Sequence, residues 1–159
     1  MAEFAYNPIQ VVEPGQNVLL DTVIPCNKGY VFHREQAGIV ILRGVVNCPQ
    51  ACFARYQVTF NGNIALAEGA EVGPISVALA IDGEPIPTSR AIVTPAGTAE
   101  DPPTIPTNFF NVTSTAIITV PRGCCFTVAV ENTSGPAEAG GTAPQILVQN
   151  ANLTVSRIS

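Results

Sequence analysis

Alternation of apolar and polar side chains with a period of two is the feature that most limits how this chain can fold. From about residue 17 to the C-terminus, short segments of this kind follow one another, separated by turn residues. No long segment has the 3.6-residue period of an amphipathic helix. The pattern predicts an all-β chain of about eight to ten strands.

Two segments show the alternation most clearly. In residues 53–60 every second side chain is apolar or aromatic, and Asn61-Gly62 after them predicts a tight hairpin turn. In residues 75–81 the odd-numbered positions are Ile, Val, Leu and Ile, which predicts a core-facing strand closed by a turn at Asp82-Gly83. The last strand is predicted over residues 151–158.

Long connections rich in proline and glycine separate some of these strands, at residues 94–108 and 133–145. Such segments cannot continue a strand ladder and are expected to be surface loops. Many short strands joined by long connections favour an antiparallel two-sheet jelly-roll sandwich over a meander barrel. We expect one such domain over residues 15–159.

Residues 1–14 are expected to form a separate N-terminal arm. The segment is too apolar for a free tail, yet it lies outside the regular alternation. The arm packs either on a partner molecule, which would make it an anchor, or on its own domain, and the sequence leaves both open. Its candidate anchoring residues are Phe4, Tyr6, Ile9, Val11 and Val12.

Charged residues are scarce, at 12% of the chain, whereas soluble domains carry about 25%. The net charge is −5 and Lys28 is the only lysine, which argues against a nucleic-acid partner because phosphate contacts need clustered Lys and Arg. A surface short of charge is instead expected to be covered by copies of the same chain. The outward strand residues expected at that interface are Phe53, Ser76, Ala78, Ala80 and Ala129.

The first residues lack the basic and apolar regions of a secretory signal peptide, and no apolar run approaches the roughly 20 residues of a membrane span. We expect cytoplasmic synthesis and no membrane partner.

The five cysteines cannot all pair within one chain, and free thiols are expected in the absence of a secretory signal. The candidates for one disulfide are Cys48, Cys52, Cys124 and Cys125, for instance Cys48 with Cys124. Because neighbouring strand residues face opposite sides, one of Cys124 and Cys125 is expected to face the core. The spacing of Cys48 and Cys52 differs from the usual zinc knuckle, so no metal site is predicted.

Nothing in the sequence predicts an enzyme. His33 is the only histidine, and there is no phosphate loop, nucleophile elbow or paired carboxylate arrangement. We therefore predict no catalytic residue, no metal and no cofactor. The sequon asparagines Asn111, Asn132 and Asn152 are expected to supply turn and ladder hydrogen bonds.

The order of several motifs resembles that of the bacterial and phage TNF/complement-like jelly rolls, such as the carboxy-terminal domains of collagen-like exosporium proteins. The resemblance covers residues 11–159. It rests on "VEPGQNVLLDT", "ISVALAIDGEPIPTS", "ITVPRG" with "FTVAVENTSG", and the closing "NANLTVSRIS". It implies a ten-stranded jelly roll that packs as a homotrimer through its outer faces. The chain departs from the family in having no collagen-like stalk and in carrying cysteines.

A trimeric jelly roll of this kind is also similar to head decoration or fibre proteins of tailed phages. That likeness implies a non-enzymatic structural protein on the capsid exterior, with the major capsid protein as partner. Two alternatives stay open: a trimer that binds a carbohydrate or host surface through residues 94–108 and 133–145, and a spore-surface component.

Overall fold

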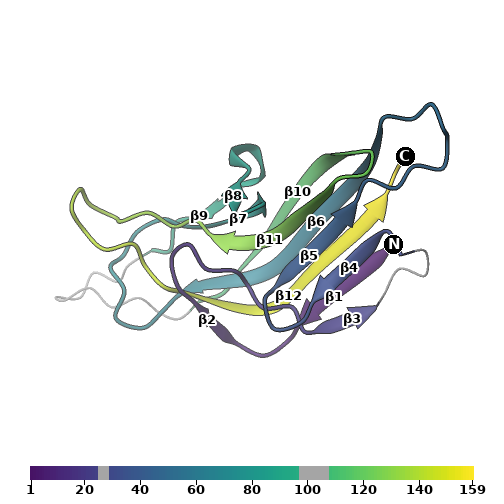
Figure 1. The fold of residues 1–159 in the computed structure, drawn as a ribbon. Coiled ribbons are helices and arrows are strands. Elements are labelled where there is room, and N and C mark those ends of the chain that lie inside the picture. The colour runs from purple at the N-terminus through teal and green to yellow at the C-terminus, as the bar shows by residue number, and fades with distance from the viewer. Residues whose placement is uncertain (25–28, 97–107) are drawn as a thin grey trace.

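The computed structural model describes residues 1–24, 29–96 and 108–159, which fold as a sandwich of two antiparallel β-sheets (Figure 1). The strands of these residues are β1 (Ala2–Tyr6), β2 (Gln10–Val12), β3 (Thr22–Ile24), β4 (Val31–Arg34), β5 (Ile39–Arg43), β6 (Phe53–Leu66), β7 (Ile75–Ile81), β8 (Glu84–Pro85), β9 (Ala91–Val93), β10 (Phe110–Pro121), β11 (Cys125–Asn132) and β12 (Ile146–Arg157). A short 3₁₀ helix, η1 (Pro87–Ser89), lies between β8 and β9. None of the helices in the described residues is long and apolar enough to cross a membrane.

The first sheet, called here the β6 sheet, has the order β10-β6-β12-β1-β3, with β2 also paired to β12. The second, the β7 sheet, has the order β4-β5-β11-β7-β8, with β9 also paired to β7. Consecutive strands from β5 to β7 and from β10 to β12 alternate between the sheets instead of pairing with each other. This is the connectivity of a jelly roll. The predicted all-β, two-sheet jelly roll is therefore confirmed, with more strands than expected.

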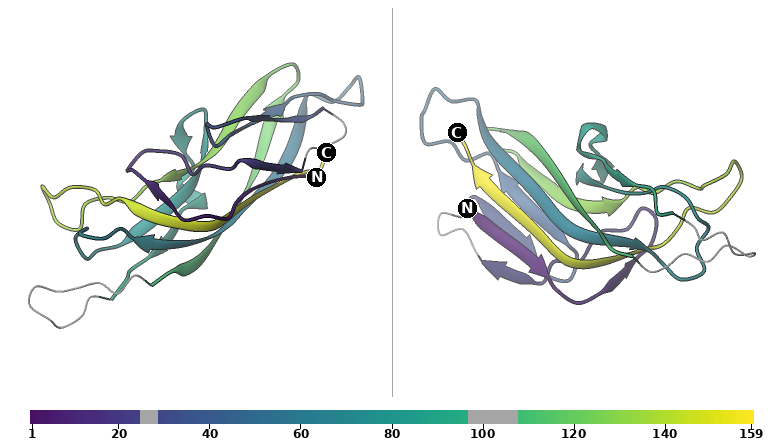
Figure 2. Two further views of the ribbon diagram at one scale, coloured as in Figure 1. Left: turned by 90° about the horizontal axis from the view of Figure 1, so that it is seen from below. Right: turned by 180° about the vertical axis from the view of Figure 1, so that it is seen from behind.

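The core is built from the inward side chains of both sheets. Figure 2 shows the two sheets from two further sides. Its largest fully buried members are Phe4, Leu20, Leu42, Tyr56, Phe60, Ile64, Ile75, Leu79, Ile118, Ile146 and Leu153. Tyr56 brings a polar atom into this core, and its hydroxyl donates to the Arg43 carbonyl at 2.5 Å. The alternation predicted for residues 53–60 and 75–81 accounts for many of these inward positions.

The N-terminal segment belongs to the sandwich. β1 lies between β12 and β3, and its pairing with β12 runs from Ala2 with Val155 to Tyr6 with Ala151. Phe4 is 1% exposed, and Val12 is also buried. Of the two alternatives that the sequence left open, the described chain has the one in which the segment packs on its own domain. The division of the chain into residues 1–14 and residues 15–159 stays a prediction.

The outward side of β7 is covered by the chain itself, contrary to expectation. Ser76, Ala78 and Ala80 are each 1% exposed, and Ala129 of the neighbouring β11 is 7% exposed. The cover is clearest at Ser76, whose hydroxyl contacts the Thr133 hydroxyl and accepts from Arg90 Nε, both at 3.0 Å.

Four of the five residues predicted to meet another copy are therefore not exposed. All four are covered within the chain itself, at Ser76 by Arg90 and Thr133. Among the five, Phe53 is accessible, at 40% exposed. An interface with another copy at these positions is still a prediction, and Phe53 is the residue of the set that could contact that copy.

The predicted hairpin turn at Asn61-Gly62 is wrong, because β6 continues through both residues to Leu66. Asn61 points outward and donates its side-chain amide to Thr113 Oγ1 of β10 at 2.8 Å. Gly62 faces inward, where a Cβ atom would lie 2.7 Å from Phe60 Cζ. The glycine leaves space for the Phe60 ring within a continuous strand. The turn at Asp82-Gly83 is confirmed, since both residues have positive φ, at 51° and 84°.

Replacing Gly62 with alanine tests this account of β6. We expect Gly62→Ala to lower the free energy of unfolding by about 1–3 kcal/mol, because the buried Phe60 ring would have to move. Urea denaturation measures the change. Gly135→Ala is the matched control, since a Cβ there meets no atom within 4 Å. Equal stability of the two variants would contradict the close packing of Gly62 on Phe60.

Candidate binding surfaces

The outer face of the β6 sheet is almost free of charge. The outward positions of its three long strands form cross-strand rows, such as Thr154, Thr59 and Thr115, which follow the registers of β12, β6 and β10. We call this surface the neutral face and define it by Gln57, Thr59, Asn61 and Asn63 of β6, Asn111, Thr113, Thr115, Ile117 and Thr119 of β10, and Gln149, Asn152, Thr154 and Ser156 of β12.

Hydrogen bonds between strands hold these side chains in place. The Thr59 and Thr115 hydroxyls lie 3.1 Å apart, and Asn111 Nδ2 donates to Asn63 Oδ1 at 3.0 Å. At the far side, Asn152 Nδ2 donates to Glu3 Oε1 at 2.5 Å. The neutral face is therefore an ordered array of amides and hydroxyls.

The sequon asparagines act as expected. Asn111 and Asn152 bond across the sheet, and Asn132 is buried. Asn132 Nδ2 donates to the carbonyls of Val12 at 3.0 Å and Pro144 at 3.2 Å. These bonds fasten the start of the chain to the connection before β12.

β10 forms the edge of the β6 sheet beside the neutral face. Its twelve residues, FNVTSTAIITVP, include no charged residue. On one side β10 pairs with β6 along its whole length, and within the described residues no strand pairs with its other side. The Ser114 hydroxyl donates to the Ser89 carbonyl across this edge. Long edge strands are normally protected by charges, and β10 carries none along its length.

Exposed apolar side chains border the neutral face. Ile117, within it, is 64% exposed, and Val11 and Ile24 on neighbouring strands are each 59% exposed. Val11 pairs with Leu147 of β12, which places it on the same side of the sheet. Of the predicted anchoring residues, Ile9 at 53% and Val11 are exposed, Tyr6 is half-buried, and Phe4 and Val12 lie in the core.

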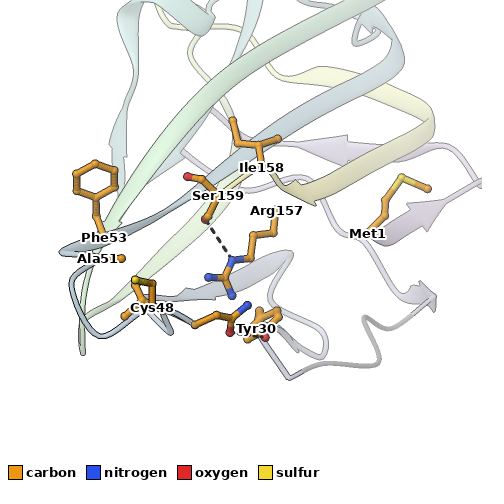
Figure 3. A pocket seen from close by; sticks show the side chains of 10 residues that line it. Met1, Tyr30, Cys48, Ala51, Phe53, Arg157, Ile158 and Ser159 are labelled. Carbon is orange, nitrogen blue, oxygen red and sulfur yellow. Dashed lines mark hydrogen bonds between the residues drawn. The ribbon is translucent and has the colours of Figure 1, made fainter.

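Both termini lie at one end of the sandwich, beside the connection between β5 and β6 (Figure 1). A pocket of about 590 Å³ opens there, lined by Tyr30, Val46, Asn47, Cys48, Phe53 and Arg157 together with residues at the two chain ends. Figure 3 shows the Arg157 guanidinium within the ring of lining side chains, near Tyr30 and Cys48.

Four of the six arginines gather at this end. Arg157 lies over the Tyr30 ring at 4.3 Å, Arg55 over Phe53 at 4.8 Å, and Arg43 over Phe32 at 5.4 Å. The fourth, Arg122, donates from Nη1 to the Pro49 carbonyl at 2.8 Å. These recorded partners are ring faces and a carbonyl, so the positive charge there is not neutralised by them. We call this region the arginine end.

The cysteines lie at the arginine end as well. Cys48, Cys52, Cys124 and Cys125 are all exposed, and none of the four forms a disulfide. The expectation that one of Cys124 and Cys125 faces the core is wrong. Cys124 belongs to the turn before β11, where its N–H donates to the Pro121 carbonyl at 3.0 Å, and Cys125 occupies an outward strand position. The fifth, Cys26, lies outside the described residues.

His33 is a half-buried residue of β4 that stacks on Phe4, with ring centroids 5.3 Å apart. Neither ring nitrogen has a hydrogen-bond partner among the described residues. The described residues also contain no cluster of three or more His, Cys, Asp or Glu side chains able to hold a metal ion.

The opposite end of the sandwich is acidic. A second pocket, of about 410 Å³, is lined there by Glu13, Glu68 and Glu71 with the residues after Thr142. Glu131 on β11 is half-buried, and this burial raises its pKa above the ordinary value, with a smaller contribution from the nearby Glu84 carboxylate.

Sequence reasoning missed Arg157, although the sequence carried a signal for it. Leu153, Val155 and Arg157 have the same parity in β12, and the first two are buried inward. An arginine that continues an inward row marks a position where the core ends and a polar group replaces a hydrophobe.

No protein-family model and no curated protein matches the sequence. Among solved structures, the chain is similar to the globular domain of zebrafish complement 1qA protein, with 11% identity and a TM-score of 0.49 over 96% of this chain and 94% of that chain. It is also similar to the sugar-binding EclA C-terminal domain, with 14% identity and a TM-score of 0.41 over 95% and 79% of the two chains.

A third similar structure is a Podospora anserina GH26-CBM35 β-(1,4)-mannanase, with 13% identity and a TM-score of 0.32 over 97% of this chain and 29% of that chain. Because all three TM-scores lie below 0.5, the jelly-roll assignment rests on strand order and register, and nothing about function follows from these proteins.

Replacing Glu131 with glutamine should stabilise the protein at neutral pH. The raised pKa means that the folded state disfavours the ionised form of Glu131. At a pH above the pKa of the folded state, the ionised carboxylate therefore lowers the stability of the protein. At a pH below the ordinary pKa of a glutamate, the group is protonated in both states and this loss of stability disappears. We expect Glu131→Gln to raise the free energy of unfolding at pH 7 by about 0.5 kcal/mol or less. The melting temperature should rise slightly as a result. The gain should vanish as the pH falls to about 4.

Thermal unfolding monitored by circular dichroism between pH 3.5 and 7.5 measures this difference. Glu138→Gln is the control, since Glu138 is exposed. A gain for Glu131→Gln that grows on acidification would have the wrong sign and would contradict the burial argument.

Proposed function

We propose that this protein is a non-enzymatic structural protein that assembles as a homotrimer through the neutral face and the adjoining edge of β10. The observation that carries the proposal is the twelve-residue uncharged edge strand, which has no strand partner on one side among the described residues. The number of subunits, three, is inferred from the family resemblance. The interface differs from the one first expected, since Ser76, Ala78, Ala80 and Ala129 are covered within the chain.

The neutral face has a low cost of burial. Removing charged groups from water costs several kcal/mol each, whereas amides and hydroxyls that already bond to each other lose less. Ile117, which is 64% exposed, adds apolar area that contributes about 25 cal/mol per Å² when removed from water. A patch of about 800 Å² on each partner is the usual size of a stable interface.

A lysine at position 117 tests the interface. We expect Ile117→Lys to convert the trimer to monomer at micromolar concentration, because the ammonium group would be buried without a partner. Light scattering after size exclusion measures the mass. Phe32→Lys is the matched control, since Phe32 is 45% exposed on β4, at the edge of the other sheet away from β7 and β9. A wild-type chain that is monomeric under these conditions would falsify the proposal.

We further propose that the trimer decorates the exterior of a virion capsid, with the major capsid protein as its partner. The resemblance to phage head proteins motivates this, and the exposed Ile9 and Val11 of the N-terminal segment supply an apolar contact. The attachment differs from a free arm, since Phe4 and Val12 are core residues. The carbohydrate alternative gains no support from residues 133–145, which include no aromatic side chain; residues 97–107 of the other loop lie outside the described residues.

The attachment can be tested with heads assembled from a major capsid protein of the genome that encodes this chain. We expect the double variant Ile9→Ser/Val11→Ser to remain trimeric and to lose co-sedimentation with the heads, while Ile92→Ser still binds. Retained binding by the double variant would move the attachment elsewhere. A neighbourhood of spore-coat genes instead of capsid and portal genes would favour the spore-surface alternative.

A further inference from the structure

We infer that the pocket at the arginine end is a binding site for an acidic sugar, with Arg157 receiving the carboxylate of the ligand. This site lies outside the residues that define the neutral face and at the opposite end from residues 133–145. Its volume of about 590 Å³ falls within the range of small-molecule sites.

Two contacts fix the position of the Arg157 guanidinium. The plane lies over the Tyr30 ring at 4.3 Å, and Nε donates to the Ser159 carbonyl at 3.2 Å. Nη1 is buried without a hydrogen-bond partner among the described residues. A buried donor that lacks an acceptor is costly, and a ligand oxygen would remove that cost. The geometry of a guanidinium suits a planar carboxylate, which accepts two parallel hydrogen bonds.

The charged side chain in the lining of the pocket favours an anion. No described lining residue has a carboxylate side chain, and Arg55 lies next to the lining residue Phe53. The pocket at the other end, with three glutamates, has the opposite character. One guanidinium in the lining matches a single negative charge, whereas phosphate sites usually gather several cations or backbone N–H groups. A carboxylate therefore fits better than a phosphate.

The remaining lining suits a sugar ring. Phe53 is 40% exposed and offers an aromatic surface, on which pyranose rings pack through their C–H groups. Hydroxyl partners are present on the other side, where the Tyr30 hydroxyl donates to Asn47 Oδ1 at 3.2 Å. An amide and a phenol that are already oriented by each other can exchange hydrogen bonds with ligand hydroxyls at little ordering cost. Aromatic, amide and cationic groups thus converge on one pocket.

Titration of the full chain with glucuronate tests the site, with glucose as the neutral match. We expect glucuronate to shift protein NMR signals of the arginine end, and glucose to bind about tenfold more weakly or worse. Arg157→Gln should weaken the affinity for glucuronate by at least about tenfold. Arg43→Gln should leave this affinity unchanged, because Arg43 stacks on Phe32 outside the pocket. Melting temperatures of both variants confirm that they fold.

Cys48 gives a second readout that needs no variant. It lines the pocket, whereas Cys125 is exposed on β11 and does not. Bound glucuronate should slow alkylation of Cys48 by N-ethylmaleimide, as measured by peptide mass spectrometry, and leave Cys125 unchanged. Equal affinity for glucose, full binding by Arg157→Gln, or no binding by the wild type would each overturn the site. Benzoate binding as tightly as glucuronate would overturn the sugar assignment.

Discussion

The double pairing of β6 is the constraint on which the rest of this structure depends. This strand bonds to β10 on one side and to β12 on the other over most of its fourteen residues, and those neighbours come from the last third of the chain. Such long-range pairing fixes which side chains face inward in all three strands at once. The continuity of β6 depends in turn on Gly62, which leaves space for the Phe60 ring.

From that ladder follow both surfaces of interest. The outward parity of β6, β10 and β12 produces the neutral face, where Asn and Thr side chains bond across strands. The inward parity of β12 carries Leu153 and Val155 into the core and then Arg157 to the open end of the sandwich. One strand register therefore positions both the neutral face and the Arg157 side chain, in separate regions of the molecule.

Charge is distributed unevenly, although there is little of it. The arginine end holds four arginines stacked on rings or bonded to carbonyls, and the opposite pocket is lined by three glutamates. The face between them carries almost none. Because the few charges lie at the two ends, the neutral face between them has a low free energy cost of desolvation.

The alternation of side chains determined the fold class by itself, since a period of two can bury one face of a strand and no helix shares that period. It also identified the inward rows of β6, β7 and the last strand. Only the tertiary structure decided what covers each outward row. Asn61-Gly62 reads as a turn locally, and pairing with two long neighbours keeps it in a strand. Ala78 and Ala80 were expected on an exposed face, and the folded chain buries both. Strand pairing and loop placement depend on contacts between distant residues, which local sequence does not specify.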